Sequence, residues 1–318
     1  MSQPEAAGPP AGASGPADHI GGSAAPSGVI HDIGYRGYQG SRQGRSSIRL
    51  ALFTHSLRGV YGLGRSGKSK IIPFGVVAVM LLPAVIIAAV GVFQSNTGLL
   101  SEPLVPYARY AVILSAALTI FVAVTAPQTV SLDMRYATLP LYLSRPLTRG
   151  DYVLAKFAAL STGVFILLAG PILVLYIGAL LADFPARTAS ADAGLALIGA
   201  VFFAVVLSGL GLVLASLTPR RGFGIAAIIT VLTLSFTIVS ALQGIFGEGF
   251  GDERLAGWIG LFSPITLVDG VQVWAFDVDS SAVFGPPDGG GPVFLLVTIA
   301  FVAACYAALS ARYRRVKL

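Results

Sequence analysis

The stretch GLGRSGKS, Gly62 to Ser69, has the spacing of a phosphate-binding loop. Gly62, four further residues, and then Gly67, Lys68 and Ser69 satisfy the pattern G-x-x-x-x-G-K-[ST], in which backbone amides and a lysine bind nucleotide phosphates. Such a loop works when a β-strand leads into the glycines and a soluble helix follows them. The flanking elements therefore decide whether this segment binds ATP.

The segments on both sides of GLGRSGKS are unsuited to a nucleotide site. The preceding RLALFTHSLRGVYGLG places apolar side chains at steps of three and four, which predicts a helix, and a long apolar run follows. No later apolar strand ends in an aspartate that could hold magnesium. We interpret Gly62, Gly67, Lys68 and Ser69 as a chance match and expect no nucleotide there: the glycines allow a bend, and the lysine is an anchor at a membrane boundary.

The composition indicates a membrane protein. Of the 318 residues, 55% are hydrophobic and 11% are charged, whereas a soluble domain has about 25% charged residues. Six apolar stretches without Asp, Glu, Lys, Arg or His are each long enough to cross ~30 Å of hydrocarbon. They are Ile71–Phe93, Tyr110–Val130, Phe157–Ala182, Ala193–Leu217, Phe223–Phe246 and Pro292–Ala311. The predicted fold class is an all-α integral membrane protein with six transmembrane helices.

The charges predict how these helices are oriented. With the N-terminus in the cytoplasm, 18 of the 21 Lys and Arg residues lie on the cytoplasmic side, and 10 of the 15 acidic residues lie on the other. This is the bias that orients membrane helices, so both termini are predicted to be cytoplasmic. The basic residues follow one membrane face without stacking aromatics, which favours lipid headgroups over nucleic acid as their partner.

Two segments precede the first span. Residues 1–45, rich in Gly, Pro, Ala and Ser towards their start, are predicted to be a disordered cytoplasmic tail. Residues 46–70 are predicted to contain an amphipathic helix that lies along the membrane surface. Its apolar face carries Leu50, Phe53, Leu57 and Val60, and another, polar face carries Arg45, Arg49 and Ser56. Residues 71–318 then form the six-span domain.

The cytoplasmic connection between the second and third spans, residues 131–156, is short and unusually aromatic. Pro140 and Pro146 prevent it from forming one long helix. Its apolar side chains are surrounded by charges from Asp133, Arg145 and Asp151, among others. Two interpretations remain open: a docking surface for another protein, which has this composition, and a loop that lies among the lipid headgroups.

The run LPLYLSRPLTRGDYVLAK, Leu139 to Lys156, resembles the cytoplasmic segment of the bacterial ABC type-two permeases, the membrane subunits of ATP-binding-cassette exporters. The segment 247–291 before the last span adds LFSPITLVDGVQVW, also similar to these proteins, in which this outer segment is partly re-entrant. The resemblance implies a permease in the bacterial plasma membrane that is not itself an enzyme and binds no cofactor.

In that family, a coupling helix after the second span sits in a cleft of a separate ATPase subunit. The resemblance therefore implies two ATPase subunits that carry ATP and Mg, and a second permease copy or paralogue. Carried over by position, the ATPase contacts would be Tyr136, Leu139, Leu141, Tyr142, Arg145, Pro146, Arg149 and Tyr152. The substrate stays open, since lipid, drug, peptide and polysaccharide are all compatible.

The fifth span carries a polar stripe at steps of three and four. The stripe either lines a substrate pathway or a dimer seam, or its hydroxyl groups bond only to their own helix backbone. Its members are Thr230, Thr233, Thr237, Ser240 and Gln243.

Other functions find less support in the sequence. A secondary transporter needs ionisable residues near the bilayer midplane, and the six spans have none. An intramembrane enzyme or a metal site is disfavoured because the three His residues all precede the first span and Cys305 is the only cysteine. A non-transporting membrane scaffold or sensor remains the alternative to a permease.

Overall fold

The computed structural model describes residues 40, 44–64, 66–97, 104–136, 138–218 and 220–315. The predicted disordered tail lies outside these residues, except for Gly40, Gly44 and Arg45. The described residues from Gly44 onward belong to one compact unit. Helices make up the secondary structure of this unit, and none of its described residues is in a strand.

Eleven α-helices and two short helical turns follow one another within the described residues. They are α1 Arg45–Val60, α2 Lys68–Asn96, α3 Tyr107–Ile113, α4 Ser115–Arg135, α5 Leu139–Leu143, α6 Arg149–Leu181, α7 Ala186–Leu217, α8 Arg221–Gln243, η1 Gly244–Gly249, α9 Glu253–Ile259, η2 Gly260–Phe262, α10 Pro264–Phe276 and α11 Gly291–Arg315. Six of them, α2, α4, α6, α7, α8 with η1, and α11, are long and apolar enough to cross a membrane. The prediction of an all-α protein with six such helices is confirmed.

Helix α4 lies in the core of the unit. In its most apolar stretch 82% of the residues are buried, against 17% for α2 and α8 and 22% for α11. Close packing around α4 depends on small residues of α7. A Cβ atom on Gly211 would lie 2.6 Å from Val122 Cγ1 of α4, so only glycine allows this approach of the two helices.

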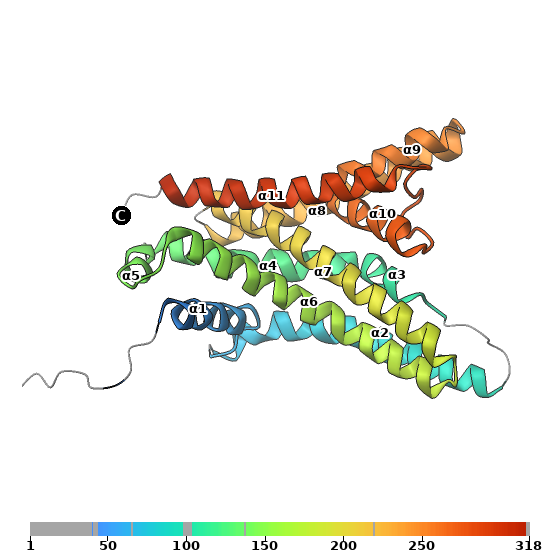
Figure 1. Ribbon diagram of the computed structural model, residues 1–318, viewed down its shortest axis with the longest axis horizontal. Helices are drawn as coiled ribbons and strands as arrows, with labels where there is room; N and C mark the ends of the chain where they lie inside the picture. Colours follow the sequence, from blue (N-terminus) through green and yellow to red (C-terminus); the bar gives the residue numbers. More distant parts are fainter. Residues whose placement is uncertain are drawn as a thin grey trace, which may run out of the picture. The chain divides into compact units, whose positions relative to one another are not determined.

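The helices define two ends of the unit. Helices α1 and α5 and the C-terminal end of α11 lie at one end, and α3, α9 and α10 lie towards the other (Figure 1). We call these the α5 end and the α10 end. Helix α10 packs against α7, α8 and α11, and every residue from Pro264 to Gln272 is buried. The α10 part of the segment 247–291 is therefore built into the helix bundle.

Residues 46–70, predicted to contain an amphipathic helix, comprise most of α1, a turn and the start of α2. Helix α1 ends at Val60, and a turn with positive φ at Gly62 (67°) and Gly64 (82°) leads to α2. A Cβ atom on Gly62 would lie 2.6 Å from the Ser69 carbonyl oxygen, so this turn requires glycine. The second span also begins later than predicted, because the helix is interrupted at Leu114 between α3 and α4.

The packed side of α1 takes residues from both predicted faces. Leu52, Ser56 and Val60 are buried, and α1 packs along α6. Leu50, on the predicted apolar face, is 61% exposed. Arg45 and Arg49 of the predicted polar face stay about half exposed and pair with Asp151 of α6.

Candidate functional site

The connection between α4 and α6 is shorter than the predicted loop 131–156. Helix α4 continues to Arg135 and α6 begins at Arg149, which leaves residues 136–148 with the five-residue helix α5. We call residues 136–148 the α4–α6 connection. Pro140 stands in the first turn of α5, where a missing amide costs least. Thr148 caps α6 by accepting from the Asp151 amide at 3.2 Å, and Asp151 Oδ2 accepts from the Thr148 amide at 2.9 Å.

A buried ion pair lies behind the α4–α6 connection. Lys156 Nζ of α6 is 2.8 Å from Asp133 Oδ2 of α4, and the two side chains are only 7% and 16% exposed. The Tyr152 hydroxyl donates to the same carboxylate oxygen at 2.6 Å. A buried charge is tolerated when it is paired and hydrogen-bonded. These contacts therefore hold the end of α4 and the start of α6 in one position.

Aromatic rings extend this cluster to α5 and α11. The Tyr152 ring lies 5.7 Å from that of Tyr142 on α5 and 5.2 Å from that of Tyr313 on α11. Lys156 Nζ lies over both the Tyr142 and the Tyr152 rings, within the range of a cation–π contact. Burial and the nearby Asp133 carboxylate raise the pKa of Tyr142, so its phenol is neutral at physiological pH. We call Asp133, Tyr142, Tyr152, Lys156 and Tyr313 the anchor cluster.

Helix α1 is joined to the same region through one carboxylate. Arg45 Nη2 lies 2.7 Å from Asp151 Oδ2, and Arg49 Nη2 lies 2.7 Å from Asp151 Oδ1. The Asp151 side chain is 10% exposed, whereas both arginines are about half exposed. Each carboxylate oxygen of Asp151 thus pairs with a different arginine of α1. Because Asp151 is also part of the N-terminal cap of α6, α1 and the start of α6 are coupled.

The eight residues expected to contact an ATPase divide into three groups by exposure. Tyr136, Leu141, Arg145 and Pro146 are exposed, and Leu141 is 71% exposed. Tyr142 and Arg149 are half-buried, and Arg149 donates to the Tyr313 carbonyl at 3.3 Å. Leu139 and Tyr152 are buried inside the chain, so they support the α4–α6 connection and offer no surface to a partner. The accessible part consists of apolar side chains with arginines beside them.

The GLGRSGKS segment lies between two helices. It follows α1 and leads into α2, which begins at Lys68. The Ser69 hydroxyl donates to the Ser66 carbonyl at 2.8 Å, and Lys68 is exposed. The order helix, turn, helix differs from the strand, loop, helix order of a phosphate-binding loop. Arg65 lies outside the described residues.

We expect replacement of Lys68 by alanine to leave ATP binding by the isolated chain unchanged, at the background level of an unrelated membrane protein. The reason is that no strand presents the turn amides to a phosphate. Equilibrium binding of radiolabelled ATP with Mg²⁺ to the purified chain measures this. Saturable binding by the unaltered chain that disappears in Lys68→Ala would contradict the interpretation of the segment as a chance match.

The polar stripe of the fifth span lies mainly on the outside of the unit. Thr230, Thr233 and Thr237 of α8 are exposed and Ser240 is half-buried. Gln243 is different: it is fully buried, and its side-chain amide donates to the carbonyls of Ala256 and Phe284 at 3.1 and 3.0 Å. Within this chain the stripe therefore lines no internal path, and Gln243 joins α8 to α9 and the segment before α11.

Three groups of polar residues in the structure were missed by the sequence analysis. Asp133 and Lys156 lie within the predicted loop 131–156 and form a buried pair. Asp269 lies in the segment 247–291, yet it is 4% exposed and accepts hydrogen bonds from Ser280 and from the amides of residues 281 and 282. Helix α4 buries Thr119, Thr125, Gln128, Thr129 and Ser131. Their concentration in the least apolar of the six spans was the available signal.

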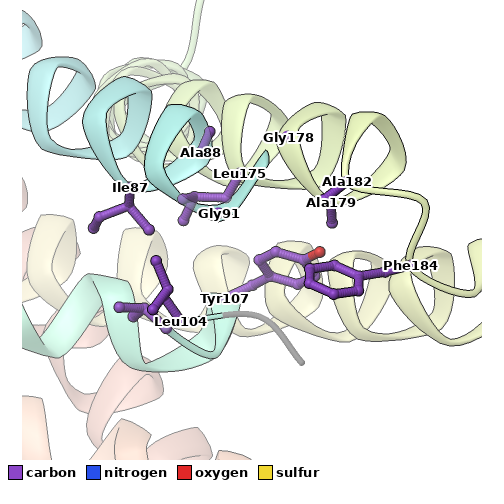
Figure 2. Close-up of a pocket in the computed structure, with 11 residues that line it drawn as sticks. Ile87, Ala88, Gly91, Leu104, Tyr107, Leu175, Gly178, Ala179, Ala182 and Phe184 are labelled. Carbon is purple, nitrogen blue, oxygen red and sulfur yellow. The ribbon is translucent and has the colours of Figure 1, made fainter. Parts of the chain in front are cut away.

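An apolar hollow lies towards the α10 end, between α2, α6 and the start of α3 (Figure 2). Figure 2 shows the Tyr107 ring beside Phe184, facing the α6 residues Ala179 and Ala182. The free volume is about 20 Å³, which is close to the space that one water molecule needs. This hollow is too small for a transported substrate.

Comparisons with known proteins leave the family open. No protein-family model matches the chain, and no curated protein matches it either. A functional proposal therefore depends on the residues and the geometry described above.

Proposed function

We propose that this chain is the membrane-spanning permease subunit of an ATP-binding-cassette transporter, of the type-two exporter kind. The observation that carries the proposal is the α4–α6 connection: an exposed apolar segment, rimmed by arginines, that stands on a buried and well-connected anchor cluster. A loop that only rested among lipid headgroups would need no such rigid support. A segment that receives a mechanical push does need it.

The proposed orientation places the α5 end in the cytoplasm. The topology predicted from the sequence places most Lys and Arg residues on the same side of the membrane as the α5 end. This distribution supports cytoplasmic termini in a bacterial plasma membrane. The exposed Leu50 and the half-buried Phe53 and Leu57 form an apolar strip on α1 next to the face packed on α6. This strip supports a position of α1 along the membrane surface.

In the proposed mechanism the fuel is ATP bound with Mg on two separate ATPase subunits, and this chain converts their closure into helix movement. A push on α5 reaches α4 through Asp133 and α6 through Tyr152 and Lys156. It reaches α11 because Tyr152 packs on Tyr313. Since the six spans hold no ionisable residue near their centres, movement of whole helices is the means by which this chain would couple to transport.

A second permease, either a copy of this chain or a paralogue, is part of the proposal. Helix α8 is largely unburied, and its exposed Thr230, Thr233 and Thr237 form a strip of small polar side chains. Such side chains allow close helix contact and interhelical hydrogen bonds in a membrane. The strip is therefore assigned to the seam between two permease subunits, with the pathway between them.

Replacement of Leu141 by aspartate tests the docking role. We expect co-purification of a co-expressed ATPase, taken from the adjacent reading frame, to fall about tenfold or more, as for an apolar hot-spot residue. Leu141 is 71% exposed, so the membrane fold should keep its unfolding midpoint. The matched control is Phe250→Asp, since Phe250 is 74% exposed at the α10 end.

The outcome distinguishes a permease from a scaffold or sensor. A permease retains the ATPase in the unaltered chain and in Phe250→Asp but loses it in Leu141→Asp. Equal recovery of the ATPase with all three chains would rule out the α4–α6 connection as the docking site. Transport by the purified chain alone in proteoliposomes would overturn the proposal as a whole.

A further inference from the structure

A long hollow follows α11 from its middle to its last turn. The first part has a volume of about 460 Å³ and lies between α6, α7 and α11, where it reaches from Thr298 to Tyr306 along α11. The second part has a volume of about 470 Å³ and reaches from Tyr306 to Arg314 and Arg315. The second part is lined by α11 residues alone, and Tyr306 lines both parts, so the two hollows adjoin along α11 at this residue. Together we call them the α11 groove.

The sequence of α11 explains the groove. Ile299, Ala303, Ala307, Ala311 and Arg315 recur at every fourth position, and residues four apart lie one above the other on a helix face. The three alanines carry only a methyl group each, so they leave a trough between the larger side chains beside them. The walls contributed by α6 and α7, such as Leu154, Phe157 and Phe202, are apolar.

The position of the groove limits what can fill it. Helix α11 is one of the helices able to cross a membrane, and only 22% of its most apolar stretch is buried. Lipid or another membrane helix therefore contacts its surface. Thr298 and Arg314 are sixteen residues apart, which corresponds to about 24 Å of helix at about 1.5 Å per residue. One leaflet with its headgroup measures about 20–22 Å, so the groove has the length of one lipid molecule.

The charge at one end of the groove selects the kind of lipid. Arg314 and Arg315 are exposed, and within the described residues neither guanidinium group has an ion-pair partner. Arg149 adds a third positive charge nearby, since it donates to the Tyr313 and Arg314 carbonyls. The other end of the groove, at Thr298 and Ile299, has no charged residue in its lining.

We propose that the α11 groove is a binding site for one anionic phospholipid, with an acyl chain in the apolar part and the phosphate group at Arg314 and Arg315. The apolar walls exclude a free phosphate as the sole ligand, and the arginine pair disfavours a zwitterionic lipid relative to one with net negative charge. The proposal is independent of the transport function, because it needs only that α11 crosses the membrane.

Native mass spectrometry of the full chain in detergent tests the site. The purified protein is titrated with phosphatidylglycerol, and in parallel with phosphatidylcholine of the same acyl chains. We expect one phosphatidylglycerol per chain to be retained in preference to phosphatidylcholine. Arg314→Gln and Arg315→Gln should each weaken retention of phosphatidylglycerol about fivefold, because one basic residue near the headgroup is lost. Ala303→Phe should weaken retention of both lipids by filling the groove.

Matched controls lie on the same helix. Arg312→Gln removes the same charge from the same last turn, and Ala304→Phe adds the same ring one residue from Ala303, yet neither residue lines the groove. The proposal predicts that both controls retain phosphatidylglycerol like the unaltered chain. Thermal unfolding checks that Ala303→Phe and Ala304→Phe fold equally well, since both alanines are exposed.

Three results would overturn the proposal. The first is equal retention in Arg314→Gln and Arg312→Gln, which would mean a diffuse charge effect. The second is a combined result: millimolar glycerol phosphate displaces the lipid, and Ala303→Phe does not change lipid retention. It would mean that the site binds an anion and no acyl chain. The third is a dimer that persists in excess phosphatidylglycerol and dissociates in Ala303→Phe, which would assign the groove to a second copy of the chain.

Discussion

Replacement of Lys156 by methionine is expected to destabilise the protein by about 3–5 kcal/mol, because the Asp133 carboxylate would stay buried without its cation. The Lys156 ammonium lies 2.8 Å from that carboxylate and its side chain is 7% exposed, so water cannot replace it readily. The lost contacts with the Tyr142 and Tyr152 rings add to the effect. The midpoint of thermal unfolding in detergent, compared with the unaltered chain, measures the loss.

A second substitution separates the lost charge pair from lost packing. In Asp133→Asn with Lys156→Met neither member of the pair is charged, and the asparagine carbonyl oxygen can still accept from the Tyr152 hydroxyl. We expect this double variant to recover most of the stability lost in Lys156→Met. Lys68→Met serves as the control, since Lys68 is exposed and its removal should change stability by less than about 1 kcal/mol. If Lys156→Met were as stable as Lys68→Met, that result would contradict a buried ion pair between Lys156 and Asp133.

The six membrane-length helices could be predicted because they depend on a local property. A stretch of about 20 apolar residues is long enough to span the hydrocarbon whatever surrounds it, and the breaks at charged and glycine-rich segments mark its ends. The N-terminal end of α6 shows the limit of this reasoning. Arg149, Asp151 and Lys156 look like loop residues by polarity, yet they belong to the helix. The Thr148 cap, the ion pairs of Asp151 and Lys156, and the hydrogen bonds from Arg149 to carbonyls of α11 satisfy them.

The partners of these charged residues could not be predicted from local sequence. Asp133 and Lys156 are 23 positions apart, and Arg45 and Asp151 are more than a hundred apart, so no periodicity within a window relates them. The same reason applies to α1. The residue pattern separates a basic face from an apolar one, but it cannot show that Arg45 and Arg49 pair with an aspartate of another helix.

The central position of α4, in contrast, was open to prediction. It is the least apolar of the six membrane-length helices and the most buried. Lipid accepts only apolar side chains at little cost, so the span with the lowest mean hydropathy has the most to gain from neighbouring protein. Thr125 and Thr129 bond to their own helix, and the Ser131 hydroxyl reaches the Ala215 carbonyl of α7 at 2.8 Å.

Replacement of Gly178 by alanine is expected to destabilise the packing of α2 on α6 by about 1–3 kcal/mol, which is the usual effect of overpacking a close contact. A Cβ atom at this position would lie 2.5 Å from Ala88 Cβ and 3.0 Å from Ala88 Cα. The obstacle includes the backbone of α2, so a change of side-chain rotamer cannot relieve it. The two helices must separate, and thermal unfolding in detergent should show a lower midpoint.

Gly75 of α2 provides a control of opposite sign. Within the described part of the chain, no neighbouring group would lie within 4 Å of its added Cβ. Alanine is more favourable than glycine in a helix interior by up to about 1 kcal/mol, so Gly75→Ala should leave the midpoint unchanged or raise it. A helix-propensity effect alone would move both variants in the same direction, and that result would contradict a tight α2–α6 contact at Gly178.

The contact can also be exchanged between the two helices. In Gly178→Ala with Ala88→Gly the methyl group moves from α2 to α6, and the space between the helices is conserved. If the close approach of Gly178 to Ala88 limits stability, this double variant should unfold nearer to the unaltered chain than Gly178→Ala does, although it carries a new glycine in α2. Recovery is expected only from this pair, because additivity fails for residues in direct contact. Ala84→Gly, one turn away on α2, should therefore give no recovery of Gly178→Ala.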